Sequence, residues 1–373
     1  MSTRRGATQP PLRVLVIATV SQSLALQSTA SWDVLSESHA DITFAAGKDE
    51  WSGHLGRWGR YVELPAERRL ASFDHVKFLV ACRRLIDQQD WDLIQIQTPI
   101  AATLARIALG RSDATVVYVA HGFHFHQDAA PWVNATVSRL ERLLARRCDA
   151  VAVVAREDYE SAVAMGMGRH TMLWHLPGAG VDTAAFAAAP PELPFGEPHL
   201  LFCGDMINRK NPLMVVDTAL ELLERGDPHP LVMIGDGPLL EAVHSRAAPL
   251  DARGLFAHVP RTDNVAGYMA GAGVHLLPSW QEGVPRVTME AMASTVPTVA
   301  MNNRGSRELA SAGAGPVMAR DSSAHDWADA VASTFGHRLD GDVAAALEFY
   351  GLESFRQSYR QLLQRVGVLP HSD

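Results

Sequence analysis

The stretch AAAPPELPFGEP at residues 187–198 decides how this chain is divided. Proline lacks the N–H group that a strand ladder or a helix interior requires, so four prolines in this short stretch predict an irregular linker. The chain has 373 residues, more than one hydrophobic core usually supports. We therefore expect two domains facing each other across a cleft, an N-terminal domain at residues 1–186 and a C-terminal domain at residues 199–342.

Upstream of the linker, short apolar runs alternate with helical patterns. The apolar runs lie at residues 13–20, 42–45, 93–97, 115–120 and 150–154, and the helical patterns lie at residues 73–88, 101–108, 133–147 and 157–165. This alternation is typical of parallel strands joined by crossover helices. It predicts an α/β domain with a doubly wound, Rossmann-like sheet.

Downstream of the linker, the same alternation starts again. Strands are expected at residues 200–203, 231–234, 274–277 and 298–301, and helices at residues 213–225, 239–247 and 287–294. They predict a second Rossmann-like domain. The tail, residues 343–373, carries a helical pattern at residues 343–366. We expect this helix to leave the second domain and to pack back on the first.

The distribution of charge argues against one large class of partner. Of the 33 Lys and Arg and the 41 Asp and Glu, 19 of each kind precede Pro190, so the net charge of −8 lies in the second half. A surface that follows the phosphates of a nucleic acid needs an excess of basic residues. We therefore expect no nucleic-acid partner.

The cysteines and the apolar runs indicate a cytoplasmic protein. Cys82, Cys148 and Cys203 are too few and too scattered for a disulfide framework, which fits a reducing compartment. Arg4 and Arg5 precede an apolar run, as in a secretion signal, but a buried first strand accounts for the same residues. No apolar stretch reaches the roughly 18 residues that a membrane-spanning helix needs.

The segment LPSWQEGVPRVTMEAMA at residues 277–293 carries two acids, Glu282 and Glu290. Glu282 is expected in a loop at the carboxyl end of a strand, and Glu290 about one helical turn into the next helix. Between them, Gly283, Val284 and Pro285 lead into a helix N-terminus, where backbone N–H groups stabilise an anion such as a phosphate. One segment can thus contact two parts of an extended ligand. Two solvated acids are the alternative.

The segment FCGDMINRKNP at residues 202–212 places two cations at a turn. A strand is expected to end at Gly204, and Arg209 and Lys210 precede Pro212, which suits the first position of a helix. Cations at such a turn can neutralise a departing diphosphate, and charge positioned in advance is commonly the largest catalytic contribution. A solvated basic turn is the alternative.

The segment YVAHGFHFHQ at residues 118–127 contains three histidines. His124 and His126 lie two residues apart without a third ligand or an H-E-x-x-H pattern, so no metal site is expected. His121 stands at the carboxyl end of a strand beside Gly122, which favours a hydrogen bond to a ligand. A buried structural histidine is the alternative.

These segments together resemble the family-four retaining glycosyltransferases, from residue 13 to about residue 366. The branch that builds capsular and extracellular polysaccharides is similar in four stretches: AHGFHFH (120–126), CDAVAVVAREDYESA (148–162), PGAGVDTAAF (177–186) and GDMINRKNP (204–212). The resemblance implies the GT-B fold, two Rossmann-like domains with a terminal helix that crosses back. It also implies a reaction that needs no metal and no other cofactor.

The resemblance implies a role for several residues. In that family, the acid that matches Glu282 faces the donor sugar, and the acid that matches Glu290 binds the ribose hydroxyls. The histidine that matches His121 lines the reaction centre. Lys210 matches the lysine that binds the diphosphate, and Gly204 lies beside the phosphates.

Three departures from the family pattern concern charge and the acceptor side. Many relatives carry an arginine five residues before the lysine, where this chain has Asp205, and Arg209 could supply that charge. The polysaccharide branch usually has histidines around the fourth strand, where this chain has Gln95 and Gln97. Residues 21–36 have lost the glycine-containing or His-Asn pattern. The last two differences lie on the acceptor side in the family.

The predicted function is transfer of a sugar, with retention, from a UDP- or GDP-sugar to a hydroxyl group in polysaccharide or glycoconjugate biosynthesis. The acceptor would be a glycan, a lipid-linked sugar or a small molecule. Three other hypotheses stay open: a glycosyltransferase of natural-product biosynthesis, a nucleotide-sugar epimerase and a non-catalytic nucleotide-sugar sensor. A lipid-linked acceptor would bring the protein to the inner face of the membrane. Arginines on the helix at 133–147 could then contact anionic headgroups, unless Glu141 counters them on a solvated face: Arg139, Arg142, Arg146 and Arg147.

Overall fold

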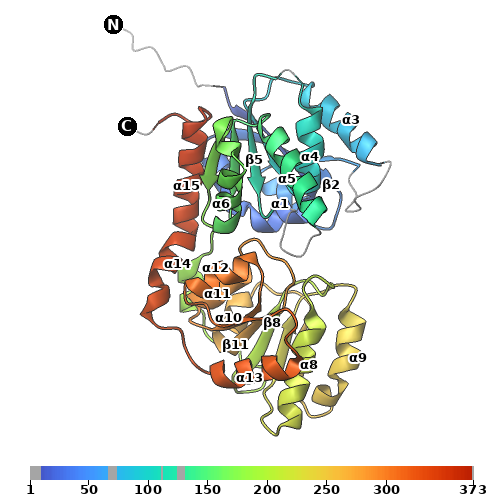
Figure 1. Ribbon diagram of the computed structural model, residues 1–373, viewed down its shortest axis with the longest axis vertical. Helices are drawn as coiled ribbons and strands as arrows, with labels where there is room; N and C mark the ends of the chain where they lie inside the picture. Colours follow the sequence, from blue (N-terminus) through green and yellow to red (C-terminus); the bar gives the residue numbers. More distant parts are fainter. Residues whose placement is uncertain (1–9, 66–73, 111, 124–130, 372–373) are drawn as a thin grey trace. The chain divides into compact units, whose positions relative to one another are not determined.

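The computed structural model describes residues 10–65, 74–110, 112–123 and 131–371. The chain forms two compact units (Figure 1). Unit 1 comprises Met1–Leu176 and Arg356–Asp373, and unit 2 comprises Pro177–Phe355. Each unit is built on a parallel sheet with helices on both faces. Within the described residues, no helix has the length and apolarity needed to cross a membrane.

Unit 1 contains a parallel sheet in the order β3-β2-β1-β4-β5-β6-β7. Its strands are β1 (Leu12–Val20), β2 (Ala40–Gly47), β3 (Gly59–Glu63), β4 (Leu93–Gln97), β5 (Thr115–Ala120), β6 (Ala150–Val153) and β7 (Met172–His175). The strand order reverses between β1 and β4: β2 and β3 lie on one side of β1, and β4 to β7 lie on the other. In open α/β sheets, ligands bind at the carboxyl ends of the strands at such a reversal.

Helices cover both faces of this sheet, which explains why its central strands are almost continuously apolar. On one face, Leu15 and Ile17 pack with the helices α3 and α4. On the other face, Trp32 of α2 meets Phe44 edge to face at 5.1 Å. The helical elements are α1 (Ser21–Gln27), α2 (Thr29–Glu37), α3 (Asp74–Ile86), α4 (Pro99–Ala108), α5 (Pro131–Ala145) and α6 (Arg156–Ala164), with the short 3-10 helices η1 (Ser52–Arg57) and η2 (Met167–Arg169).

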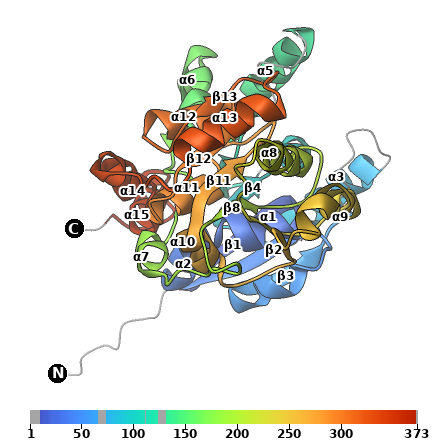
Figure 2. The ribbon, with the colours of Figure 1, turned by 90° about the horizontal axis from the view of Figure 1, so that it is seen from below.

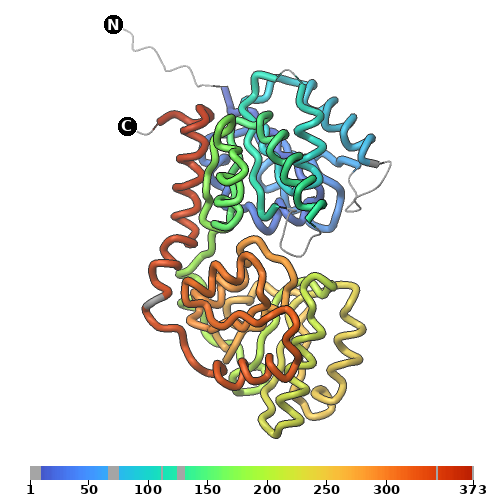
Figure 3. Tube along the Cα trace, in the orientation of Figure 1, coloured from blue at the N-terminus to red at the C-terminus, as the bar shows by residue number. Residues whose placement is uncertain are grey.

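The C-terminal helix α15 (Leu352–Arg365) joins this second face of unit 1 from Arg356 onward. Its Tyr359 hydroxyl donates a hydrogen bond to Oε1 of Gln95 on β4. Trp174 of β7 donates a hydrogen bond from Nε1 to the Ser358 hydroxyl at 3.0 Å. Figure 3 follows this C-terminal trace along unit 1.

The tail is not the single helix that periodicity predicted. The short helix η3 (Gly341–Val343) is followed by α14 (Ala344–Tyr350) and then, after Gly351, by α15. Gly351 is extended and forms a parallel bridge with Val181. The Val181 carbonyl accepts the N–H of Leu352 at 2.9 Å, and the Val181 N–H donates to the Tyr350 carbonyl at 3.1 Å. This pairing with a distant segment interrupts the helix.

Unit 2 contains a parallel sheet in the order β10-β9-β8-β11-β12-β13. Its strands are β8 (His199–Cys203), β9 (Leu231–Ile234), β10 (Phe256–Val259), β11 (Ala272–Leu277), β12 (Thr298–Met301) and β13 (Val317–Met318). Here β8 and β11 are neighbours, although about 70 residues separate them in the chain. The two segments singled out in this half of the sequence therefore follow adjacent strands.

The helices of unit 2 also form two layers. In Figure 2, α8 and α13 lie on one side of β8 and β11, and α7, α10 and α11 lie on the other. Alternate residues of β8 serve these two cores: Phe202 packs with α8 and α13, while Leu201 packs towards α10 and α11. The helices are α7 (Thr183–Ala188), α8 (Pro212–Glu224), α9 (Leu240–Asp251), α10 (Val265–Gly271), α11 (Arg286–Ala293), α12 (Arg304–Ser311) and α13 (Ala324–Thr334).

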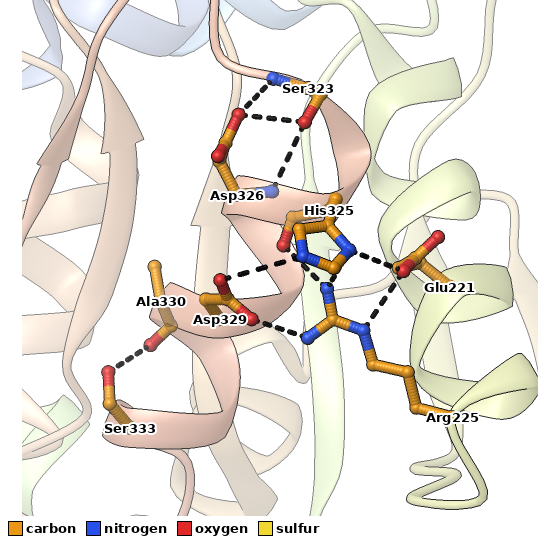
Figure 4. Close-up of polar contacts among 8 residues, drawn as sticks. All are labelled: Glu221, Arg225, Ser323, His325, Asp326, Asp329, Ala330 and Ser333. Atoms are coloured by element: carbon orange, nitrogen blue, oxygen red, sulfur yellow. Dashed lines mark hydrogen bonds and ion pairs between the residues drawn. The ribbon is translucent and has the colours of Figure 1, made fainter.

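A polar network on the surface joins α8 to α13 (Figure 4). Arg225 pairs with Glu221 at 2.9 Å along α8 and with Asp329 of α13 at 2.5 Å. His325 of α13 also contacts Glu221, at 2.8 Å. The helix α13 begins with a capping box, in which Ser323 and Asp326 each bind the other's backbone N–H. Single surface ion pairs contribute little, so the network mainly fixes how these two helices meet.

The proline-rich stretch at 187–198 lies within unit 2. Its Glu192 N–H donates to the Gly267 carbonyl at 2.8 Å, and Asn264 Nδ2 donates to the Glu192 carboxylate at 3.4 Å. Gly271 brings α10 so close that a β-carbon there would stand 2.2 Å from the Glu192 carbonyl oxygen. The stretch is thus packed on α10, and the compact units divide between Leu176 and Pro177 instead.

Candidate functional site

Lys210 and Glu282 form an ion pair at the carboxyl ends of two adjacent strands. The Lys210 side chain follows β8, and the Glu282 side chain follows β11. Lys210 Nζ lies 2.7 Å from Glu282 Oε1, and Nη1 of Arg209 lies 3.5 Å from the same oxygen. The parallel arrangement of β8 and β11 brings these loops together at one edge of the sheet.

The pair is largely buried, while Arg209 is open to solvent. The side chains of Lys210 and Glu282 are 15% and 11% exposed, against 45% for Arg209. Burial by itself would raise the pKa of Glu282, but the charges of Lys210 and Arg209 outweigh it and hold that pKa below its usual value. Glu282 is therefore ionised at neutral pH. Arg209 also donates from Nη1 to the Gln281 carbonyl at 2.9 Å.

Glu290 has the partner that its apolar surroundings require. It lies one turn into α11 and is 8% exposed, and Arg286 pairs with it at 2.8 Å across that turn. Burial raises the pKa of Glu290, against the opposing charge of Arg286. At the start of α11, the N-cap residue Pro285 provides no side-chain hydrogen bond, so backbone N–H groups of the first turn lack a side-chain cap.

The loop between the two acids is held by the N-terminus of α12. A β-carbon on Gly305 would stand 1.8 Å from the Gly283 carbonyl oxygen and 2.7 Å from Pro285. Only glycine permits this approach. Asn303, the N-cap residue of α12, donates from Nδ2 to the Ser279 carbonyl at 2.8 Å. The backbone of the Gly283, Val284 and Pro285 loop is thereby fixed.

Gly204 stands where the turns after β8 and β9 touch. Its N–H donates to the Ile234 carbonyl at 2.9 Å. A β-carbon on Gly235, whose φ is +133°, would stand 2.0 Å from the Gly204 carbonyl oxygen. Asp205 follows in this turn and is half-buried. It is an acid at the position where many relatives have arginine. Arg209, four residues later, instead brings a positive charge to the Glu282 carboxylate beside Lys210.

In unit 1, a second polar cluster lies at the carboxyl ends of β1, β4 and β5. His121, which follows β5, is half-buried, and burial lowers its pKa to about 4. Its Nε2 lies 3.5 Å from the Ser28 hydroxyl, which donates to Gln97 Oε1 at 2.9 Å. The Thr98 hydroxyl accepts the Thr19 N–H at 2.9 Å. Sequence reasoning did not single out Ser28, Thr98 or Thr19, because no local pattern marks them.

Gln95 and Gln97 have different environments. Both are fully buried. Gln97 ends β4 in the cluster with Ser28, whereas Gln95 binds Tyr359 of the C-terminal helix. Gln95 therefore secures α15 to the sheet, and Gln97 is the glutamine that belongs to the polar cluster.

The predicted site residues divide between the units. Eight of them lie in unit 2 around the carboxyl ends of β8 and β11: Gly204, Arg209, Lys210, Glu282, Gly283, Val284, Pro285 and Glu290. His121 lies in unit 1, and His124 and His126 lie outside the described residues. Among the residues that the structure describes, no group of three His, Cys, Asp or Glu is arranged to hold a metal ion.

Glu141 does not counter the arginines of α5, contrary to one interpretation of the sequence. It lies on the buried face of the helix, where its carboxylate pairs with the fully buried Arg106 of α4 at 2.8 Å. Arg106 also stands over the ring of Tyr118, 4.4 Å from its centroid. A buried arginine needs such a partner, so Glu141 is committed to the core of unit 1.

Comparison with protein families agrees with this arrangement. The model of the glycosyl transferase 4-like domain matches residues 26–201, and the model of the glycosyl transferases group 1 matches residues 197–336. The chain belongs to the glycosyltransferases. Consecutive family models thus account for the two halves of this glycosyltransferase, and the predicted membership of the family-four glycosyltransferases is confirmed.

Similar curated proteins include three bacterial ones. EpsD of Bacillus subtilis, named as a glycosyltransferase, is 28% identical over 61% of this chain and 63% of its own length. An Escherichia coli UDP-Gal:α-D-GlcNAc-diphosphoundecaprenol α-1,3-galactosyltransferase is 23% identical over 65% and 66%. The Mycobacterium tuberculosis GDP-mannose-dependent α-(1-6)-phosphatidylinositol monomannoside mannosyltransferase is 29% identical over 75% of each. The glycosyltransferase spans just under two thirds of the length of the first two relatives.

Solved structures show the same fold. Anabaena HepE in complex with UDP and glucose aligns with a TM-score of 0.69 at 16% identity, over 95% of this chain and 100% of that one. Sucrose-phosphate synthase from Thermosynechococcus elongatus aligns with a TM-score of 0.71 at 17% identity, over 95% and 99%. The predicted α/β GT-B fold with two Rossmann-like domains is confirmed.

Proposed function

We propose that this glycosyltransferase moves a sugar from a nucleotide diphosphate donor to an acceptor hydroxyl, with retention of the anomeric configuration. The observation that carries the proposal is the buried contact between Lys210 and Glu282, with Arg209 beside it. A lysine, an arginine and an ionised carboxylate meet here beside two helix N-termini. A nucleotide sugar presents matching chemistry, because its diphosphate is anionic and its sugar carries hydroxyl groups that donate to a carboxylate.

The N-termini of α8 and α11 support the assignment of the diphosphate to this place. Lys210 lies two residues before Pro212, the first residue of α8, and Glu282 lies four residues before Arg286, the first residue of α11. Helix N-termini favour anions through unpaired backbone N–H groups and the helix dipole. Together with Lys210 and Arg209, they would stabilise the charge that develops on the departing diphosphate without a metal ion or another cofactor.

Each acid is assigned a different end of the sugar donor. Glu282, next to the lysine, would accept hydrogen bonds from hydroxyls of the transferred sugar. Glu290, one turn into α11, would accept hydrogen bonds from the ribose hydroxyls. Gly204 and the loop of Gly283, Val284 and Pro285 would lie along the phosphates, since their backbone is fixed by close packing rather than by long side chains.

The chemical step follows from this charge arrangement. The acceptor hydroxyl would attack the anomeric carbon from the face that the diphosphate leaves, and an oxygen of the leaving diphosphate would take its proton. No enzyme nucleophile is required in this route. The contribution of the protein is then to hold the acceptor hydroxyl and the departing diphosphate on the same face of the anomeric carbon and to neutralise the leaving group.

A lipid-linked acceptor is the alternative that the comparisons favour. The names of the galactosyltransferase and the mannosyltransferase both contain a lipid, diphosphoundecaprenol and phosphatidylinositol monomannoside. We therefore place the acceptor among lipid-linked glycans of polysaccharide or glycoconjugate biosynthesis, ahead of a soluble small molecule.

The exposed face of α5 supports a proposed contact with the anionic lipid headgroups at the inner face of the membrane. Because Glu141 is turned into the core, the exposed face of α5 keeps its arginines and adds apolar side chains. Trp132 is 73% exposed and Leu143 is 60% exposed. Arginine and tryptophan on one helix face suit the interface between headgroups and acyl chains. The basic and large apolar side chains exposed on this face are Trp132, Arg139, Leu140, Arg142 and Leu143, and the exposed Arg146 follows directly after the helix.

Turnover with a panel of UDP- and GDP-sugars, with and without lipid-linked acceptors, tests the proposal. We expect release of nucleoside diphosphate that depends on the acceptor. NMR of the product should show that the transferred sugar keeps the anomeric configuration that it had in the donor. Isomerised nucleotide sugar without acceptor would indicate an epimerase. Binding of a nucleotide sugar without any turnover would indicate a sensor.

A further inference from the structure

We propose that Ser28 and Gln97 are positioning residues that hold the His121 imidazole in its Nε2-protonated tautomer, so that Nδ1 offers a hydrogen-bond acceptor to a substrate hydroxyl. The contacts of Ser28 and Gln97 stand on their own. The last step, towards substrate, rests on the proposed glycosyl transfer.

The direction of the hydrogen bonds follows from what each atom can do. A serine hydroxyl has one hydrogen to donate and lone pairs with which to accept. Ser28 donates its hydrogen to Gln97 Oε1, a carbonyl oxygen that can only accept, at 2.9 Å. Ser28 then has no second hydrogen to give, so a hydrogen bond across the 3.5 Å contact between Ser28 Oγ and His121 Nε2 takes its hydrogen from Nε2. Nε2 carries the proton, and Nδ1 keeps the lone pair.

The surroundings keep this chain of contacts in place. Ser28 is 1% exposed and Gln97 is fully buried, so water does not compete for the hydroxyl. Thr98, next to Gln97, has a φ of +62°, which a β-branched residue rarely adopts. Its hydroxyl is bound by Thr19, from the backbone N–H at 2.9 Å and from the hydroxyl at 2.8 Å. These bonds fix the end of β4 and, with it, Gln97.

Ser28 and Gln97 each lie where the sequence departs from the family pattern. Ser28 belongs to the drifted segment at 21–36, and Gln97 stands where the polysaccharide branch usually has histidines. Ser28 and Gln97 are 69 residues apart in the chain, and their side chains are nevertheless direct partners. The departures thus form one local arrangement that ends on His121.

The chemical consequence concerns selectivity. Because burial lowers the pKa of His121 to about 4, the ring is neutral near pH 7, and its tautomer decides which nitrogen accepts. An acceptor nitrogen recognises a hydroxyl and cannot protonate the leaving diphosphate. A site built around one hydrogen bond discriminates strongly against a substrate that lacks the matching group.

NMR on the ¹⁵N-histidine-labelled full chain tests the tautomer directly. Long-range ¹H–¹⁵N correlations identify the protonated nitrogen, and the His121→Gln variant assigns the signal among the 16 histidines. We expect Nε2–H in the native chain at pH 7.5. Ser28→Ala should give a mixture of tautomers, while Ser28→Thr, which keeps the hydroxyl, should restore Nε2–H. Ser23→Ala, a buried serine whose hydroxyl binds the Val20 carbonyl, is the matched control.

Two NMR results would overturn the proposal. The first is an Nδ1–H signal in the native chain, which would mean that the Gln97 amide is reversed and that Ser28 donates to His121. The second is an unchanged spectrum in a folded Ser28→Ala variant. Should Ser28→Ala not fold, Gln97→Met, compared with Gln97→Glu, provides the same test, because only the carboxylate keeps the acceptor for Ser28.

Kinetics separate this proposal from the proposed function. With an active sugar donor and acceptor pair, Ser28→Ala should lower kcat about tenfold, the equivalent of one hydrogen bond, and Ser28→Thr should recover most of it. If the native chain has the Nε2–H tautomer but transfers no sugar, the proposed function is refuted, while the proposed positioning of His121 by Ser28 and Gln97 stands. An unaltered kcat in Ser28→Ala, with a shifted tautomer, would refute the role towards substrate.

Discussion

Lys210 and Glu282, 72 residues apart in the chain, join the turns after β8 and β11 through a 2.7 Å contact between Nζ and Oε1. The acid assigned to the transferred sugar therefore holds the lysine assigned to the diphosphate. Each side chain positions the other before any substrate binds. Such preorganisation removes the cost of ordering two flexible side chains during the reaction.

The Glu282→Gln variant tests the charge of this side chain separately from its size. Glutamine keeps the size of the side chain but loses the charge that holds Lys210, so we expect kcat to fall about tenfold or more. Glu282→Ala should also lower the melting temperature, because it leaves Lys210 charged, largely buried and unpaired. Steady-state kinetics and thermal unfolding measure both effects, with Glu224→Gln, an exposed acid at the end of α8, as the control. A normal kcat in Glu282→Gln would refute the role of the charge.

Gly305→Ala should displace the loop between the two acids. A β-carbon there would stand 1.8 Å from the Gly283 carbonyl oxygen, so one of the two backbones must move. We expect a loss of roughly 1–3 kcal/mol in the free energy of unfolding and weaker binding of the sugar donor. Denaturant unfolding and calorimetry check the two effects. Gly336→Ala is unsuitable as a control because its φ is positive, whereas Gly341→Ala meets open space. Equal donor affinity in Gly305→Ala and Gly341→Ala would contradict the account.

Buried histidines should make the protein less stable in mild acid. Burial lowers the pKa of His199 to about 4 and, with the charge of Lys210, that of His275 to about 3. The unfolded chain binds these protons below about pH 6.5, and the folded chain does not until these lower values. Stability is therefore full above pH 6.5 and falls as the pH drops towards 4, by up to about 1.4 kcal/mol per pH unit for each histidine.

Urea unfolding of the native chain and of His275→Gln at pH 7.5, 6 and 5 measures that dependence. The variant should have a smaller slope of stability against pH, while His337→Gln, at an exposed position, should keep the native slope. Parallel curves for the native chain and His275→Gln would show that the buried ring is not responsible.

Flotation with liposomes tests the exposed face of α5. We expect the chain to float with vesicles that contain phosphatidylglycerol and to stay behind with pure phosphatidylcholine. The double variant Arg139→Gln and Arg142→Gln should reduce partitioning on the order of 30-fold, at about 1 kcal/mol per arginine. The control removes two exposed arginines of unit 2, Arg253→Gln and Arg338→Gln. Equal binding to both vesicle types, or no binding, would remove the membrane from the account.

Much of the fold could be predicted because buried parallel strands are continuous apolar runs. The strands at 93–97, 115–120 and 231–234 were predicted with the bounds that the structure has. The edge strands β3, β7, β10 and β13 were all missed, since they are only half-buried and are either very short or include charged or polar residues. The interruption at Gly351 could not be predicted either, because its cause is pairing with Val181, a distant residue.

Part of the candidate site could also be predicted from the sequence, because its residues follow strands that are recognisable as apolar runs. Local patterns marked Glu282, Lys210 and His121 as residues that follow strands, and the first two lie together because β8 and β11 are neighbours. Strand order is a long-range property that these patterns do not contain. The contact of Ser28 with Gln97 and the approach of Gly305 to Gly283 also depend on segments that are distant in the chain or carry no sequence signal of their own.

Turnover of the Lys210→Ala variant, with a confirmed pair of sugar donor and acceptor, tests whether Lys210 neutralises the departing diphosphate. We expect a loss on the order of 10²-fold or more in kcat, whereas Lys48→Ala, at an exposed lysine of unit 1, should leave kcat unchanged. We also expect Lys210→Ala to weaken binding of the nucleoside diphosphate but not of the corresponding nucleoside. An unchanged kcat in a folded Lys210→Ala variant would contradict the assignment of this site to the departing diphosphate.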